Sequence, residues 1–162
     1  MIRAIMAADD LGGISKNGSM PWPKNSSDLQ WFKKNTMNEI VVMGRLTWID
    51  PFMPTPLKGR INVLITNQEK EKYLGADEYF SGNILTKILS LSEKYNDKDI
   101  YIIGGSEILN QLFELIEEFY LTKIYGNFKC DKNIDLKKIQ ESMQMIKKIE
   151  NDRYSHFEIW KK

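Results

Sequence analysis

The sequence predicts one α/β domain over residues 1–162, with a central, mostly parallel twisted sheet, flanking helices and an antiparallel C-terminal hairpin. Three observations lead to this prediction. The early apolar runs are continuous, which is typical of strands buried on both faces of a sheet. Segments with helical periodicity separate several of these runs, as in parallel α/β sheets. The last two runs alternate more between apolar and polar residues and flank a short polar segment, which favours a hairpin.

Seven short apolar runs, bounded by turn residues, are expected to form the strands. In chain order they span residues 2–8, 40–43, 61–65, 100–103, 119–125, 143–149 and 154–160. The helices expected between the earlier runs are residues 29–35, a short stretch after Gly44, residues 84–91 and residues 108–116. Glu150, Asn151 and Asp152 are expected to turn the chain between the last two strands. Open sheets of this kind bind ligands at the carboxyl ends of their strands, so we expect the site there.

Composition narrows the classes of function. With 162 residues and 42% hydrophobic content, the chain can bury one real core, and no linker or repeat divides it. The formal net charge is +1, with acids and bases interspersed. We therefore expect neither nucleic acid nor a membrane surface as the main partner.

Cys130 is the only cysteine, which excludes an internal disulfide and a multi-cysteine metal site and favours a reducing compartment. The apolar N-terminal residues meet Asp9 and Asp10 too soon for a signal peptide. No run approaches the ~20 residues of a membrane span. We expect a cytoplasmic protein without a metal centre.

Asp28 is the first candidate for a chemical role. In the predicted first helix it shares a face with Phe32 and lies beside Leu29, and a carboxylate beside an aromatic wall suggests a site. The helix dipole also favours an acid in the first turn, so Asp28 is equally well explained as a solvated acid behind an N-cap at Ser26 or Ser27. The helix alone leaves both interpretations open.

Gly44 and the Gly104-Gly105-Ser106 segment each lie where an apolar strand gives way to a helix. A glycine at that point lets backbone N–H groups approach a phosphate at the positive end of the helix. Either glycine alone is more simply explained by a tight turn, but two such turns favour a dinucleotide site. The spacing differs from the Gly-x-Gly-x-x-Gly fingerprint, so an ordinary Rossmann dehydrogenase is a poor match.

Several motifs occur in one order and together resemble the dihydrofolate reductase family over nearly the whole chain. They are Met20-Pro21-Trp22, Asp28-Leu29-Gln30-Trp31-Phe32, Met43-Gly44-Arg45-Leu46-Thr47-Trp48, Gly59-Arg60, Ile102-Ile103-Gly104-Gly105 and Tyr120-Leu121-Thr122. The resemblance implies reduction of 7,8-dihydrofolate to tetrahydrofolate by hydride transfer from NADPH, in support of one-carbon and thymidylate metabolism. It also implies a monomer whose partners are small molecules.

The resemblance assigns catalytic roles to Asp28, Trp22 and Thr122. Asp28 is expected to orient the pterin, Thr122 to hydrogen-bond the Asp28 side chain, and Trp22 to lie near the water that carries the proton. Leu57 with Phe52 or Met53 is expected to line the channel for the aminobenzoyl ring. The substrate-binding residues implied are Ile5, Asp28, Leu29, Phe32, Leu57, Arg60, Ile103 and Thr122. Arg60 is the residue expected to grip the substrate's α-carboxylate, because a guanidinium binds a carboxylate through two bonds.

The resemblance also implies the coenzyme site. Its residues are Ala7, Ile14, Asn17, Gly18, Ser19, Met20, Gly44, Arg45, Leu46, Thr47, Thr66, Asn67, Ile103, Gly104, Gly105, Ser106, Glu107 and Ile108. Arg45, Thr66 and Asn67 are expected around the adenosine 2′-phosphate, which predicts NADPH over NADH. Gly104 and Gly105 are expected to be joined by a cis bond, and the loop over residues 12–23 to act as a mobile lid.

Four positions depart from the family pattern: Ser15, Leu46, Glu107 and Leu109. Leu46 and Glu107 weaken the electrostatic case for a phosphate site. Two other functions remain open on the sequence. One is the related NADPH-dependent pyrimidine reductase of riboflavin synthesis, against which Met-Pro-Trp, Asp28 and Arg60 argue. The other is a non-catalytic folate- or nucleotide-binding protein.

Overall fold

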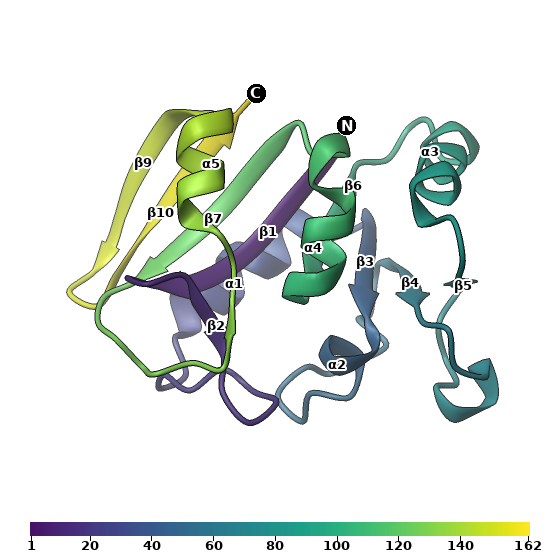
Figure 1. The fold of residues 1–162 in the computed structure, drawn as a ribbon, viewed down its shortest axis with the longest axis horizontal. Helices are drawn as coiled ribbons and strands as arrows, with labels where there is room; N and C mark the ends of the chain where they lie inside the picture. The colour runs from purple at the N-terminus through teal and green to yellow at the C-terminus, as the bar shows by residue number, and fades with distance from the viewer.

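The structure, a computed structural model, describes all 162 residues and contains an eight-stranded sheet with helices on both faces (Figure 1). The strand order is β5-β4-β3-β6-β1-β7-β10-β9. The pairs from β5 to β7 are parallel, whereas β10 pairs antiparallel with both β7 and β9. A second sheet joins β2 and β8. The predicted parallel sheet with an antiparallel C-terminal hairpin is therefore confirmed.

The elements have the following bounds. The strands are β1 (Ile2–Asp9), β2 (Gly13–Ser15), β3 (Ile40–Gly44), β4 (Ile61–Ile65), β5 (Glu78–Phe80), β6 (Ile100–Gly104), β7 (Glu118–Ile124), β8 (Lys132–Asn133), β9 (Gln144–Asp152) and β10 (Ser155–Lys161). The helices are α1 (Ser26–Thr36), α2 (Arg45–Trp48), α3 (Ile84–Lys94), α4 (Ser106–Leu112) and α5 (Leu136–Ser142), with 3-10 turns at Lys70–Lys72 and Phe113–Leu115. None of the helices is long and apolar enough to cross a bilayer.

The central strands are buried on both faces because the sheet separates two apolar cores. Val42 of β3 packs into the larger core with α3 and α4, whereas its neighbour Val41 packs into a smaller core with Trp48 and Leu57. Trp31 of α1 packs against this second core from its margin. In Figure 1, α4 and α5 lie in front of the sheet and α1 lies behind it. The continuous apolar runs arise from this double burial.

Local boundaries correct the sequence prediction at several points. The segment 108–116 is not one helix, because α4 ends at Leu112 and a 3-10 turn follows. The hairpin turn lies at residues 153–154 rather than at Glu150–Asp152, since β9 continues through Asp152. The sequence does not predict β2, β5, β8 or α5. Three of these are strands of two or three residues, too short for a period to be visible.

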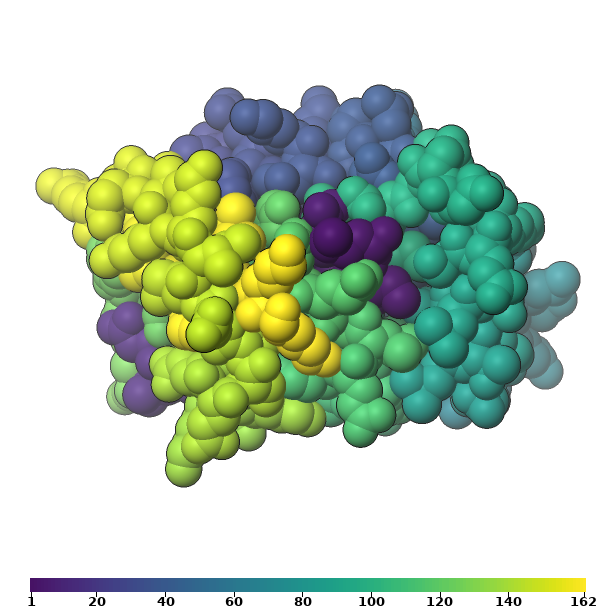
Figure 2. Space-filling view, turned by 90° about the horizontal axis from the view of Figure 1, so that it is seen from above, coloured from purple at the N-terminus to yellow at the C-terminus, as the bar shows by residue number.

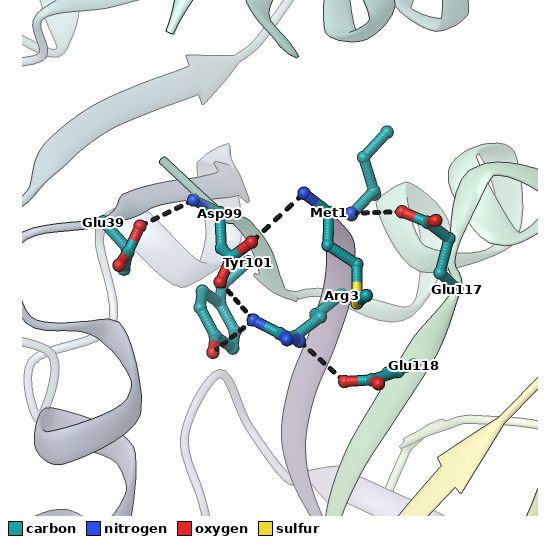
Figure 3. A network of polar contacts seen from close by, with 8 residues as sticks. Met1, Arg3, Glu39, Asp99, Tyr101, Glu117 and Glu118 are labelled. Carbon is teal, nitrogen blue, oxygen red and sulfur yellow. Dashed lines mark hydrogen bonds and ion pairs between the residues drawn. The ribbon is translucent and has the colours of Figure 1, made fainter. Parts of the chain in front are cut away.

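A polar network joins the strands at the end of the sheet where β1 and β6 begin (Figure 3). The Arg3 guanidinium forms ion pairs with Asp99 and with Glu118, the latter at 2.8 Å from Nε. Asp99 also accepts the N-terminal ammonium at 3.1 Å. Burial raises the pKa of Tyr101, on which Arg3 lies, to about 12. Figure 2 shows the N-terminal and C-terminal segments, purple and yellow, on this same face of the molecule. The network fixes the strand ends that lie away from the glycine turns.

Candidate active site

Two glycine turns form one wall of the site. Gly44 is the N-cap of α2 and Gly105 is the N-cap of α4, so both helix N-termini open at the carboxyl ends of neighbouring strands β3 and β6. A Cβ on Gly44 would lie 2.8 Å from Cγ1 of Ile108. The Gly104–Gly105 bond is cis, as the resemblance implies, and Gly104 has a φ of +141°. Backbone N–H groups at these two turns can therefore approach a bound phosphate without a side chain in between.

A cleft of about 790 Å³ lies in front of the turns. It is bounded by the carboxyl ends of the strands, by the 12–23 loop and by the start of β8. The expected coenzyme residues that line it are Ala7, Ile14, Gly18, Met20, Gly44, Arg45, Leu46, Thr47, Thr66, Asn67, Ile103, Gly104, Gly105, Ser106, Glu107 and Ile108. Asn17 and Ser19 do not line the cleft, although they belong to the same loop. The volume is ample for a dinucleotide-sized ligand.

The cleft has further lining residues outside the expected coenzyme set, and one of them, Met53, is expected at the site in the substrate channel. They are Met6, Ser15, Asp50, Met53, Ile65, Gln68, Gly82, Ile84, Gln111, Asp131 and Lys132. Asp131 and Lys132 come from a segment with no recognisable motif. The pairing of β2 with β8 brings them to the cleft, and no local signal in the sequence indicates that pairing.

The loop over residues 12–23 is held in place by both of its neighbours. Ser19 Oγ donates to Asp50 Oδ1 at 3.1 Å, and the Asn17 N–H donates to Asp131 Oδ2 at 2.9 Å. The loop also contains β2 and a backbone bridge between Lys16 and Ser19. It is thus a partly structured segment that covers one side of the cleft.

Asp28 lies half-buried in the first turn of α1. Thr122 of β7, itself 1% exposed, donates its hydroxyl to Asp28 Oδ1 at 2.6 Å. Burial raises the pKa of Asp28; the Thr122 hydrogen bond opposes this shift, and the charge of Asp152 adds to it. The contact expected between Thr122 and Asp28 is confirmed, and a simple solvated first-turn acid is excluded.

The helix cap differs from the sequence prediction. Asn25, not Ser26 or Ser27, is the N-cap of α1, and its Oδ1 accepts from the Asp28 N–H at 3.0 Å. Asn25 Nδ2 also lies 3.2 Å from Ser155 Oγ on β10. Asparagine caps as well as serine does, and its second polar atom ties the helix start to the C-terminal hairpin.

Arg60 lies across from the end of α1. Its Nη1 donates to Thr36 Oγ1 at 3.1 Å and its Nε donates to the Lys58 carbonyl at 3.0 Å. The side chain is half-buried, and burial lowers the pKa of the guanidinium, which stays charged at neutral pH. One further guanidinium nitrogen, Nη2, makes no hydrogen bond to the protein and can take an anionic group.

The apolar residues expected around a substrate fall into two groups. Ile5, Leu57 and Ile103 are buried in the second core, and Ile103 also lines the cleft. Leu29 is 40% exposed, and Phe32 packs at the margin of that core. Met53 lines the cleft whereas Phe52 is 73% exposed, so Met53 is the better candidate for the channel.

Trp22 is the remaining residue expected in a catalytic role. Trp22 is 8% exposed, and its ring meets the ring of Phe128 edge to face, with centroids 5.7 Å apart. Phe128 belongs to the segment between β7 and β8, so Trp22 is packed by a part of the chain that the sequence prediction leaves out.

An α/β sheet with paired glycine turns at a large cleft, together with a half-buried carboxylate that Thr122 holds on α1, defines a dinucleotide-dependent enzyme. Comparison with known proteins narrows this class. A model of the dihydrofolate reductase family matches residues 1–161. Dihydrofolate reductase type 8 of Escherichia coli is 31% identical over 164 residues, covering 99% of this chain and 96% of that protein. The dihydrofolate reductase of Sus scrofa is 31% identical over 154 residues, covering 85% of this chain and 82% of that protein.

A solved structure agrees with the sequence relatives. Dihydrofolate reductase from Enterococcus faecalis, complexed with NADP(H) and RAB-propyl, matches with a TM-score of 0.83 and 25% identity. The match covers 99% of this chain and 95% of that chain. The protein therefore belongs to the dihydrofolate reductase family, whose members reduce dihydrofolate to tetrahydrofolate with NADPH. The resemblance and the activity inferred from the motifs are confirmed.

Proposed function

We propose that Asp28, Thr122 and Trp22 are the catalytic residues with which this chain reduces 7,8-dihydrofolate. The observation that supports this most strongly is the 2.6 Å hydrogen bond from Thr122 to the half-buried carboxylate of Asp28. It fixes the carboxylate of Asp28 as a hydrogen-bond acceptor between α1 and β7. When bound, NADPH supplies the hydride.

Asp28 orients the substrate in this proposal. Its Oδ1 accepts from Thr122, which leaves Oδ2 and a second lone pair of Oδ1 for the aminopyrimidine edge of the pterin. Two parallel hydrogen bonds to an ionised carboxylate fix a planar ring in one orientation. Such orientation lowers the activation barrier for hydride transfer, because the substrate loses its translational and rotational freedom on binding and not in the transition state.

Trp22 and Met20 control access of water in this proposal. Trp22 is nearly buried and Met20 lines the cleft, and both belong to the loop that covers one side of it. A water molecule admitted there carries the proton to the pterin nitrogen next to the carbon that accepts the hydride. Asp28 keeps a positioning task, because in the family its carboxylate lies on the far side of the ring from that nitrogen.

We propose that NADPH occupies the cleft, with its phosphates at the two glycine turns. Arg45 and Thr66 line one part of the cleft, where a guanidinium and a hydroxyl suit a 2′-phosphate. Leu46 and Glu107 also line the cleft, but leucine is uncharged and glutamate is acidic, so neither adds positive charge at the phosphates. The preference for NADPH over NADH then depends mainly on Arg45.

Arg60 binds the α-carboxylate of the substrate in this proposal, through the guanidinium nitrogen that no protein group occupies. Leu57, which is buried in the second core, and Met53, which lines the cleft, contact the aminobenzoyl ring in this proposal. We further propose a monomeric, single-domain enzyme of the cytoplasm with no nucleic-acid partner. The free thiol of Cys130 suits a reducing compartment.

The test is the fall in NADPH absorbance on addition of dihydrofolate, with NADH as the comparison coenzyme. Wild type and the control Asp97→Asn, which changes an exposed acid just before β6, should consume NADPH at similar rates. Asp28→Asn should bind NADPH but lose most turnover at neutral pH. Near-normal turnover of Asp28→Asn would refute the role of Asp28. Folate binding without any NADPH consumption would favour a non-catalytic binding protein, and consumption with a pyrimidine sugar phosphate alone would favour the riboflavin-pathway reductase.

A further inference from the structure

Asp9 is a buried acid that the reaction as described does not use. It ends β1 and is 1% exposed. Its two carboxylate oxygens bind different parts of the chain. Oδ1 accepts from the backbone N–H groups of Leu11 at 2.9 Å, just before the 12–23 loop, and of Gly13 at 2.8 Å, inside it. Oδ2 accepts from the backbone N–H of Phe128 at 3.0 Å and from the Cys130 thiol at 3.7 Å.

Each of these segments leads directly into the cleft. The first continues through β2 into Ile14 and Met20, and the second continues into Asp131, all of which line the cleft. Although burial opposes it, the three backbone N–H donors hold the pKa of Asp9 below its usual range, so Asp9 stays ionised at neutral pH. The charge of Asp9 therefore fixes the 12–23 loop relative to the segment around Phe128.

The contact continues from Phe128 to Trp22. The Phe128 ring meets the Trp22 ring at an interplanar angle of 75°, the edge-to-face geometry that aromatic pairs prefer. The backbone N–H of the same residue is the one that Asp9 fixes. A shift of Phe128 would therefore free the nearly buried indole ring of Trp22 to move.

We propose that Asp9 and Phe128 are positioning residues for the reduction, and that they act by holding Trp22 in place. The proposal rests on the role given to Trp22 under the proposed function. Asp9 fixes the Phe128 backbone and Phe128 packs against the Trp22 ring, which the proposed function places near the proton-carrying water. No other residue of β1 makes side-chain hydrogen bonds to both loops.

A matched pair of variants separates this role from simple bracing of the loops. Asp9→Asn keeps one oxygen, which suffices for Leu11 and Gly13, but replaces the acceptor for Phe128 with an amide NH₂. The control is Asp10→Asn. Asp10 Oδ2 accepts from the Gly126 N–H at 2.8 Å, so it joins the same two segments without reaching Phe128 or Trp22. Phe128→Leu removes the ring and keeps an apolar side chain, which provides a second route if Asp9→Asn does not fold.

The first readout is ¹⁹F NMR of the full chain labelled with 5-fluorotryptophan. The chain has four tryptophans, and the loss of one resonance in Trp22→Phe assigns the signal of Trp22. Asp9→Asn and Phe128→Leu should shift or broaden this signal and leave the other three unchanged, whereas Asp10→Asn should leave all four unchanged. An unchanged Trp22 signal in Asp9→Asn and Phe128→Leu would overturn the proposal, and so would the same change in Asp10→Asn.

The second readout is turnover with NADPH and dihydrofolate. Misplacement of a catalytic group costs about 10-fold or more in kcat, so Asp9→Asn and Phe128→Leu should lose that factor with little change in the KM for NADPH. In the Trp22→Phe background the same substitutions should have almost no further effect. Additive losses in that background would overturn the proposal. Wild-type turnover of Trp22→Phe itself would instead refute the proposed function of Trp22, and the ¹⁹F spectra would still show whether Asp9 positions the ring.

Discussion

Thr122→Val is the most informative single change at the candidate site. Valine has nearly the shape of threonine, so the buried position on β7 stays filled while the hydroxyl that donates to Asp28 Oδ1 is lost. The hydrogen bond stabilises the ionised form of Asp28 and opposes the effect of burial on its pKa. Its removal should therefore raise the pKa of Asp28 further and loosen the carboxylate that orients the substrate.

The size of the effect follows from the kind of bond. A hydrogen bond to a charged group contributes about 1.5–3 kcal/mol, which corresponds to roughly 10-fold to 150-fold in kcat/KM. The distance of 2.6 Å and the burial of Thr122 both place this bond among the stronger ones of its class. The backbone of β7 should be unaffected, so the fold should persist, and loss of the hydrogen bond should lower both the activity and, at neutral pH, the melting temperature.

The assay is the pH profile of kcat/KM for dihydrofolate at saturating NADPH. If ionised Asp28 is required, activity falls as the pH is lowered through its pKa, and this acid limb should lie at higher pH in Thr122→Val than in wild type. Thr86→Val, an exposed threonine of α3, serves as the control. An acid limb at the wild-type position, or a loss of activity that is the same at every pH, would refute the reasoning.

Further predictions concern the two arginines, the first glycine turn and the charge of Asp28. Arg60→Ala should raise the KM for dihydrofolate and leave NADPH affinity unchanged, since it loses a contact made equally before and during the reaction; weaker NADPH binding alone would contradict this. Arg45→Ala should lower the ratio of kcat/KM for NADPH to that for NADH by about 10-fold or more, and an unchanged ratio would show that other groups select the coenzyme. Gly44→Ala should weaken NADPH binding in calorimetry and destabilise the fold by about 1–3 kcal/mol, because its Cβ meets Ile108 at 2.8 Å. Asp28→Asn should raise the melting temperature at pH 7, since a buried acid with a raised pKa destabilises the fold above the pKa of the unfolded chain, and this gain should vanish below about pH 3.8.

The main strands could be predicted because burial on both faces requires an apolar residue at every position, which is visible in the local sequence. Neighbours such as Val41 and Val42 enter opposite cores, so the strand reads as a continuous apolar run whatever its partners are. α5 carried a usable signal that the prediction passed over: Asp135 as N-cap, followed by Leu136 and Ile139 at helical spacing. β2 and β8 had no such signal, because their pairing depends on contacts between distant segments.

The site residues, like the strands, could be predicted where their signal is local and could not where it depends on distant segments. The glycine turns were visible in the sequence because each lies where a strand meets a helix, and that junction is local. The role of Asp28 was not decided locally, since its partner Thr122 lies on a strand far along the chain and a first-turn acid satisfies the helix dipole by itself. The contribution of Asp9 was invisible for a related reason: its carboxylate binds backbone N–H groups, and these carry no side-chain signature.

The position of β1 has a consequence for how the chain is made. β1 is early in the sequence but lies in the middle of the sheet, where Ile2 pairs with Ile100 and Arg3 with Glu118. A ribosome adds about 5–20 residues each second, so β1 waits on the order of 10 s for both partners. During that interval its apolar residues are exposed to other nascent chains and to chaperones. The centre of the sheet forms only after β7 has left the ribosome. The same holds for the hydrogen bond from Phe128 to Asp9 and for the one from Thr122 to Asp28.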